Sequence, residues 1–113
     1  MSTDKHINPS ELEHRSSEAV ELLKAISNEH RLKILCLLVQ GEKNVGELDA
    51  VIDLGQSALS QHLAVLRKKN LVKTRKVSQT VYYSIAGQEP QAIMETLYSV
   101  FSQSPTPSLG AKS

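Results

Sequence analysis

The fold is decided by residues 56–69, which read QSALSQHLAVLRKK. Leu59, Leu63 and Leu66 recur at the helical spacing i, i+4 and i+7, so this stretch predicts a helix with one apolar face against a core. The opposite face carries short side chains, where an ordinary solvated helix face would carry Glu and Lys. The members of this second face are Gln56, Ser57, Ser60, Gln61 and Ala64.

A second helix precedes this one across a tight turn. Asn44 and Glu47 have the spacing of a capping box, so a short helix is predicted over residues 45–51, with Leu48 facing inward. The turn that follows, residues 53–55, ends in glycine. Two helices joined by a short turn that contains glycine are typical of a helix-turn-helix unit.

After residue 70 the hydropathy period changes to two. Val81, Tyr83 and Ile85 alternate with more polar residues, and β-branched side chains are frequent. Residues 71–85 therefore predict a β-hairpin that turns near Ser78. A hairpin directly after a helix-turn-helix unit is the wing of a winged helix.

Three further helices complete the expected fold. Apolar residues at helical spacing predict helices over residues 11–27, 29–40 and 89–103. Five helices with one hairpin predict the α+β class and a winged helix-turn-helix fold, formed by a single domain over residues 11–103. The polar ends, residues 1–10 and 104–113, are expected to be flexible tails.

The chain of 113 residues has room for one domain. Its formal net charge is +1, but the charged residues are unevenly distributed along the sequence. Residues 54–88 hold six basic residues and no Asp or Glu, whereas the rest of the chain holds seven basic and twelve acidic residues. A basic third in a near-neutral protein predicts contact with a polyanion. Because the sequence has neither a long apolar run nor a secretory signal, we expect no membrane association and a cytoplasmic protein.

Together these features predict sequence-specific binding to double-stranded DNA. An α-helix fits the major groove, which is about 12 Å wide, and Gln and Ser side chains can hydrogen-bond base edges. The polar face of residues 56–64 is the candidate base-reading surface, and nearby cations are candidates for phosphate contact. For Lys68 and Lys69, the alternative is that they balance the helix dipole. The candidate phosphate contacts are His62, Arg67, Lys68, Lys73, Arg75 and Lys76.

One such domain covers a few base pairs, which is too little for useful selectivity, so the interpretation needs a homodimer on an inverted-repeat operator. The first and last predicted helices carry apolar side chains that a small domain does not easily cover. The alternative is that both helices pack into the core of one chain. The candidate interface residues are Leu22, Ile26, Ile93, Leu97 and Phe101.

Several short segments of the chain match the pattern of a known family. They are residues 28–35 (NEHRLKIL), 45–48 (VGEL), 56–63 (QSALSQHL), 66–67 (LR), 71–76 (LVKTRK) and 79–83 (QTVYY). This pattern resembles the ArsR family of small dimeric winged-helix repressors, and most of all its branch of haemolysin-gene activators and persulfide-responsive repressors. The resemblance covers about residues 18–103 and implies a DNA-binding transcriptional regulator.

Many members of that family release DNA when a metal ion binds, which needs clustered ligands at fixed spacing. Here residues 44–48 contain no cysteine, and residues 90–103 contain no histidine. The four histidines are scattered along the chain, at His6, His14, His30 and His62. We therefore expect no metal site, no cofactor and no response to metal.

Cys36 is the single cysteine of the chain, so no intrachain disulfide can form. The resemblance matches Cys36 to the first thiol of the persulfide-responsive branch and Ser102 to the second. Ser102 either replaces a cysteine or marks a protein that senses differently or not at all. A thiol-redox or persulfide response at Cys36 is one hypothesis. The alternative is that Cys36, in a buried-looking helix, is a small apolar packing residue.

Two functions of other classes stay open from the sequence. A winged helix can dock onto another protein without binding DNA, and Cys36 could serve a small thiol enzyme. The enzyme hypothesis lacks a resolving cysteine and a motif that places a histidine base beside the thiol, so we predict no enzymatic activity. Operator binding could repress transcription, or activate it by displacing a silencing protein, because both outcomes require occupancy of the operator.

Overall fold

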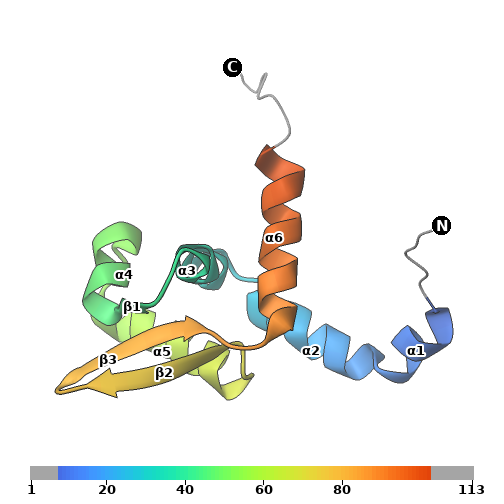
Figure 1. Ribbon diagram of the computed structural model, residues 1–113, viewed down its shortest axis with the longest axis horizontal. Coiled ribbons are helices and arrows are strands. Elements are labelled where there is room, and N and C mark those ends of the chain that lie inside the picture. The colour runs from blue at the N-terminus through green and yellow to red at the C-terminus, as the bar shows by residue number, and fades with distance from the viewer. Residues whose placement is uncertain (1–7, 103–113) are drawn as a thin grey trace.

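The computed structural model describes residues 8–102. This part of the chain forms six helices and a three-stranded antiparallel sheet (Figure 1). The predicted winged helix-turn-helix fold is confirmed. In chain order the elements are α1 (Pro9–His14), α2 (Ser16–Ile26), α3 (Glu29–Val39), β1 (Lys43–Asn44), α4 (Val45–Ile52), α5 (Gln56–Lys68), β2 (Val72–Val77), β3 (Thr80–Ile85) and α6 (Gln88–Ser102).

The fully buried leucines and isoleucine of the core come from α3, α4 and α5, and residues of α2, β2 and α6 complete the cluster. Leu59, Leu63 and Leu66 of α5 have no solvent exposure, so the predicted apolar face of this helix is confirmed. They pack in one cluster with α3 and α4, to which those helices contribute the fully buried Ile34, Leu35 and Leu48. This packing fixes α5 in place and leaves its other side in solvent.

Side-chain hydrogen bonds fix both ends of α4. Asn44 Oδ1 accepts the backbone N–H of Glu47 at 2.8 Å, and Glu47 Oε1 accepts that of Asn44 at 2.9 Å, so the predicted capping box is confirmed. After α4, Asp53 takes a left-handed conformation, and Asp49 Oδ1 accepts the N–H of Gly55 at 2.9 Å. Local bonds therefore set the angle between α4 and α5.

The wing is the hairpin of β2 and β3, which turns between Val77 and Thr80 as predicted. The sheet also has a strand that the sequence did not indicate, because Lys43 and Asn44 pair with β3 and give the strand order β1-β3-β2. A strand of two residues is too short to show a period of two. β3 is consequently the central strand and is held on both sides.

The predicted first helix, residues 11–27, is two helices, which raises the number in residues 8–102 from five to six. The chain becomes helical at Pro9, inside the predicted tail, because Asn8 Oδ1 accepts the N–H of Ser10 at 3.0 Å and proline suits a first turn. Arg15 separates α1 from α2 with φ −112° and ψ 20°. Residues 1–7 and 103–113, which include the rest of both predicted tails, lie outside the described residues.

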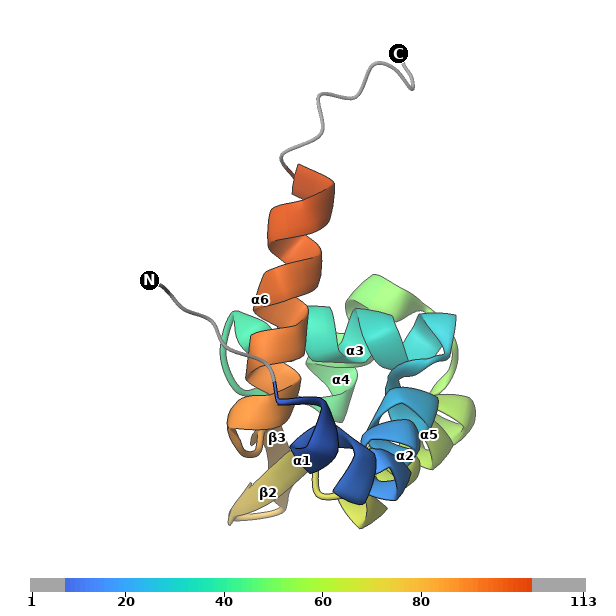
Figure 2. The same ribbon diagram turned by 90° about the vertical axis from the view of Figure 1, so that its right-hand side faces the viewer.

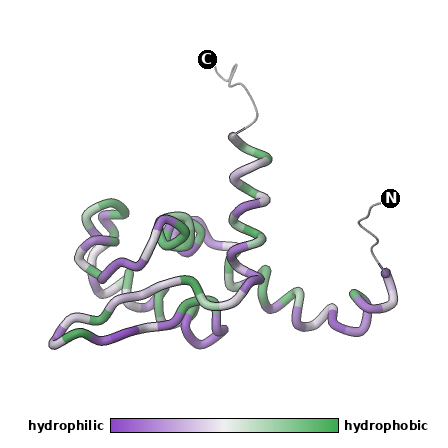
Figure 3. Tube along the Cα trace, in the orientation of Figure 1, coloured by the Kyte–Doolittle hydropathy of each residue, from purple (hydrophilic) through white to green (hydrophobic). Residues whose placement is uncertain are grey.

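α6 projects away from the side of the molecule where α5 and the hairpin lie (Figures 1 and 2). The start of α6 is anchored, since Pro90 and Met94 are buried and the helix packs against α3. Hydrophobic segments continue along α6 toward its free end (Figure 3), where Tyr98, Val100 and Phe101 are exposed.

Candidate nucleic-acid interface

The predicted base-reading face of α5 lies in solvent. Its five members, Gln56, Ser57, Ser60, Gln61 and Ala64, are exposed, and the leucines of the opposite face are fully buried. The helix begins at Gln56 after Gly55, which offers no side-chain cap, and it has no acidic residue in its first turn. The positive end of its dipole is therefore open to an anion.

The predicted phosphate contacts differ in their ion pairing. Arg67, Lys68, Lys73 and Lys76 are exposed, and none of them pairs with a carboxylate among residues 8–102. These four cations carry the positive charge that the surface of α5 and the wing presents to solvent.

Arg75 does have a carboxylate partner, which comes from outside the acid-free stretch. Its Nε and Nη2 atoms donate to the Glu42 carboxylate at 3.0 and 2.6 Å, and its guanidinium lies 5.4 Å from the centre of the Tyr82 ring. The hydrogen bond from Arg75 lowers the pKa of the Glu42 carboxyl group. The sequence places Glu42 before β1, and the unexpected β1–β3 pairing brings it to the wing.

Lys69 has a similar partner at the other end of the basic stretch. Its Nζ donates to Glu21 Oε1 of α2 at 2.9 Å, which joins the end of α5 to α2. Lys69 lies just after the last residue of α5. The six cations of residues 54–88 therefore divide into four unpaired and two paired, a division that linear charge counting does not reveal.

His62 lies at the edge of the exposed face of α5, and its phosphate contact stays a prediction. Its side chain is half-buried against α3, with Nδ1 3.4 Å from Arg31 Nη1 and the ring 5.6 Å from that of His30. Because arginine can only donate, a hydrogen bond between these two atoms requires an unprotonated His62 Nδ1. Burial, with smaller contributions from Arg31 and His30, lowers the pKa of His62.

Arg31 is a structural residue that the sequence reasoning missed. Its Nε donates to the carbonyl oxygen of Ala25 at 2.6 Å and its Nη2 to that of Lys24 at 3.3 Å. Arg31 thus satisfies carbonyls at the end of α2 while it contacts His62 of α5. The available signal was its helical spacing to the buried Ile34 and Leu35, at i+3 and i+4, because a cation beside that face needs acceptors.

The predicted dimer-interface residues fall into three groups. Ile26 is 6% exposed and packs in the core of the single chain, so it is removed from the interface set. Leu22, Ile93 and Leu97 are half-buried and pack against the same core. Phe101 is 73% exposed. Further exposed apolar side chains near these positions are Val20, Leu23, Tyr98 and Val100.

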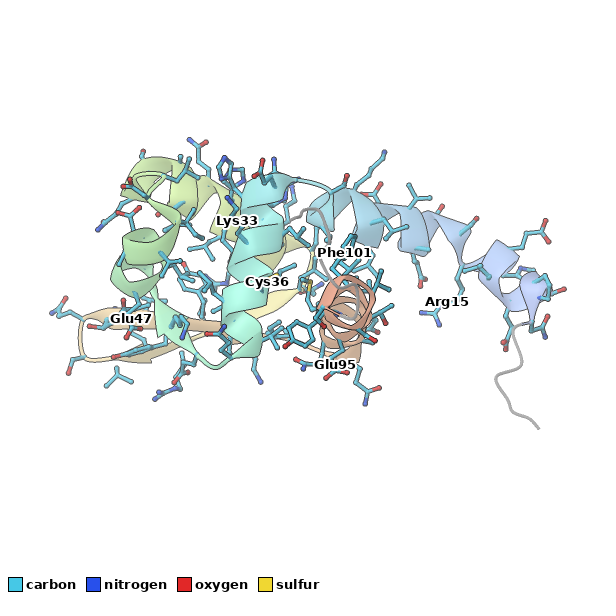
Figure 4. All side chains as sticks on the ribbon, turned by 90° about the horizontal axis from the view of Figure 1, so that it is seen from above. Arg15, Lys33, Cys36, Glu47, Glu95 and Phe101 are labelled. Carbon is cyan, nitrogen blue, oxygen red and sulfur yellow. The ribbon has the colours of Figure 1, made fainter. Side chains whose placement is uncertain are left out.

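Cys36 is exposed, contrary to the buried position that its leucine neighbours suggested. Its side chain lies on the side of α3 that faces α6 (Figure 4). Partial burial raises the pKa of the Cys36 thiol. At the end of α6, the Ser102 hydroxyl donates to the carbonyl oxygen of Tyr98 at 2.5 Å.

Residues 8–102 contain neither a candidate metal site nor a membrane-spanning helix. This part of the chain has no group of three or more His, Cys, Asp or Glu side chains placed to hold a metal ion. None of its helices combines the length and the apolar character needed to cross a bilayer.

Comparison with known proteins gave concordant matches. Residues 28–74 match the family described as bacterial regulatory protein, arsR family. The chain is 50% identical over 97 residues to the transcriptional activator HlyU of Vibrio cholerae, covering 86% of this chain and 90% of the relative.

Solved structures give the same picture. A structure of reduced HlyU from Vibrio cholerae has a TM-score of 0.77 and 52% identity, covering 80% of this chain and 96% of that chain. The transcriptional repressor BigR from Xylella fastidiosa has a TM-score of 0.79 and 37% identity, covering 84% of this chain and 97% of that chain.

Proposed function

Since the chain belongs to the ArsR family of bacterial regulatory proteins, we propose that two copies of it bind an inverted-repeat operator in the cytoplasm, with α5 of each copy in the major groove. The predicted class, a DNA-binding transcriptional regulator without enzymatic activity, is confirmed by the relatives. The relatives include a named activator and a named repressor. Occupancy of an operator is the property that both outputs require.

The observation that carries the proposal is the division of α5 into two faces. Three fully buried leucines hold the helix to the core, while the short polar side chains of the other face are exposed. Gln61 can bond adenine at two atoms, Ser60 can bond several base edges, and the Ala64 methyl can touch the methyl group of thymine. A helix that presents these groups to solvent has the width and the chemistry to read a major groove.

The four unpaired cations support the placement of the DNA backbone beside α5 and the wing. Arg67 and Lys68 lie at the end of α5, and Lys73 and Lys76 lie on β2. If all four contact phosphates in both subunits, counterion release gives a slope of about −7 in a plot of log affinity against log salt concentration.

The proposed dimer uses the exposed apolar side chains of α2 and α6. Leu23, Tyr98, Val100 and Phe101 are each more than half exposed in the single chain. Burial of such side chains contributes about 1.5–3 kcal/mol each, so a two-fold contact between these helices can hold two chains together. α6 projects to the side opposite α5 (Figures 1 and 2), which leaves the DNA-facing surface free in a dimer.

The test is a binding titration by fluorescence anisotropy. A duplex is first selected from a random pool with the wild-type protein, and its affinity is then compared with that of an unrelated duplex. We expect tight binding to the selected duplex that weakens steeply with salt. Failure to enrich any duplex at low salt would contradict the proposal and favour a protein-docking role.

We also propose that modification of Cys36 changes DNA affinity. The thiol is exposed and lies on the side of α3 that faces α6, so an added group there can alter the packing between the two helices (Figure 4). Because its pKa is raised, we expect reaction with a persulfide donor to speed up as the pH rises. A donor that leaves both the mass and the DNA affinity of the protein unchanged would contradict this proposal.

A further inference from the structure

An open groove of about 420 Å³ separates the second half of α5 from the sheet. One wall comes from α5 and the other from β3, where Tyr83 is the contributing residue. Leu63 is fully buried, whereas the other α5 residues of the groove are exposed. The α5 residues that line it are Ser60, Leu63, Ala64, Arg67 and Lys68.

Tyr83 is held in place by its strand and by the core. β3 is the central strand, and Tyr83 is paired with Thr74 of β2 on one side and Lys43 of β1 on the other. Its ring packs against the hydrophobic core, and the residue is half-buried. A tyrosine fixed in this way presents its hydroxyl group with little loss of side-chain entropy on binding.

The side chains of the two adjacent tyrosines of β3 lie on opposite faces of the sheet. Successive side chains of a strand point to opposite faces. The ring of Tyr82 lies beneath the Arg75 guanidinium, whereas Tyr83 lines the groove beside α5. Tyr82 is therefore a matched control for Tyr83, since it has the same side chain on the same strand.

The polar groups that line the groove lack partners among the described residues. The Tyr83 hydroxyl makes no hydrogen bond to any residue in 8–102, and Arg67 and Lys68 form no ion pair there. A neutral donor next to two free cations, with no carboxylate lining the groove, suits a monoanion with several acceptor oxygens.

We propose that Tyr83 donates its phenolic hydrogen to a backbone phosphate of the DNA, which lies in this groove beside Arg67 and Lys68. This inference rests on the proposed function and adds Tyr83, an uncharged side chain, to the residues that contact the DNA backbone. A phosphate, and not a base edge, is assigned because the groove borders the basic end of α5. Of the base-reading face, Ser60 and Ala64 also line the groove, whereas Gln56, Ser57 and Gln61 do not, so the phosphate is placed directly beside the bases that this face reads.

The test replaces Tyr83 by phenylalanine, which keeps the ring and removes the hydroxyl group. The affinity of Tyr83→Phe for the operator is expected to fall about tenfold or more, because the variant loses a hydrogen bond to a charged group. Its affinity for an unrelated duplex is expected to fall by the same factor, because a phosphate contact does not depend on sequence. The salt slope should equal that of the wild type, because a phenol releases no counterion. Arg67→Ala should reduce the slope by about 0.9 per subunit.

The control is Tyr82→Phe, which is expected to bind as the wild type does. Urea unfolding of both variants checks that each folds with wild-type stability. Equal affinity of Tyr83→Phe and the wild type, or an equal loss in Tyr82→Phe, would overturn the inference. A loss confined to the selected duplex would also overturn it, because that result indicates a base contact.

Single methylphosphonate substitutions identify the phosphate itself. The wild type should lose affinity when one particular phosphate in each half-site is neutralised, and Tyr83→Phe should lose markedly less at that same position. If the loss from Tyr83→Phe and the loss from methylphosphonate substitution simply added at every phosphate, the assignment would be overturned. If the wild-type protein binds no duplex, the proposed function itself fails. If the wild type binds and Tyr83→Phe binds equally well, only the phosphate contact of Tyr83 is ruled out.

Discussion

α5 and α6 are the two longest helices of residues 8–102, and both leave a large surface in solvent, but the chemistry of those surfaces differs. α5 buries three leucines completely and exposes Gln, Ser and Ala. α6 buries Pro90 and Met94 near its start and exposes Tyr98, Val100 and Phe101 near its end. The difference indicates two kinds of partner, since short polar groups suit base edges and large apolar groups suit another protein surface.

The largest expected effect concerns α6. Phe101→Glu should raise the dissociation constant of the dimer by about 10²–10⁴, because two buried phenylalanines contribute about 1.5–3 kcal/mol each. Sedimentation should show monomers, and operator binding should weaken in parallel. Val51→Glu on α4 is the control, since Val51 is also exposed, at 65%, but lies away from α2 and α6. If Phe101→Glu dimerised as tightly as the wild type, the exposed end of α6 would not be the protein-binding surface.

The next effect concerns the base-reading face of α5. Gln61→Ala should lower the preference for the selected operator by about 1–3 kcal/mol per lost base contact, while binding to an unrelated duplex stays nearly constant. Competition titrations with duplexes that differ at one base pair measure this preference. An equal loss on all duplexes would show that Gln61 contacts the backbone instead.

A smaller effect tests the paired cation of the wing. Arg75→Ala should weaken binding to all duplexes alike, because it leaves the Glu42 carboxylate without its partner beside the wing. The double variant Glu42→Gln with Arg75→Ala should regain most of the affinity, because Glu42 and Arg75 form a neutral pair at 2.6 Å. The salt slope of each variant is measured on an unrelated duplex. No recovery in the double variant would mean that Arg75 leaves Glu42 when DNA binds.

The smallest effect is a pH dependence of stability at the junction of α3 and α5. The pKa of His62 is lowered from 6.5 in the folded chain, so the unfolded chain takes up the proton at higher pH. The free energy of unfolding should therefore be highest above about pH 6.5 and fall as the pH drops toward the folded pKa. Urea midpoints at several pH values measure this trend. His62→Gln should flatten it, and His14→Gln on α1 should not.

The sequence predicted the parts of the fold that local patterns determine. The leucine period of α5, the capping box of Asn44 and Glu47 and the alternation in β3 each depend on residues a few positions apart, and each is present. The break at Arg15 and the two-residue strand β1 were missed. Neither feature gives a periodic signal, because the break involves the single residue Arg15 and the strand β1 has only two residues.

The candidate site was predicted in outline, and its errors come from contacts distant in sequence. Arg75 and Glu42 are 33 residues apart, and Arg31 and His62 are 31 apart, so no spacing rule reveals either pair. Cys36 has leucine neighbours but is exposed, because it lies on a side of α3 that the core does not cover. Ile26 shows the reverse error, because it was predicted to lie at the surface and is buried in the core.

Dimethyl sulfate footprinting of the selected duplex shows whether the exposed face of α5 lies in the major groove. The reagent methylates guanine N7 in the major groove and adenine N3 in the minor groove. We expect two patches of protected guanine N7, with centres about 10 base pairs apart, and we expect both to be lost with the monomeric Phe101→Glu variant. Full occupancy of the duplex with every guanine N7 still reactive would contradict this placement of α5.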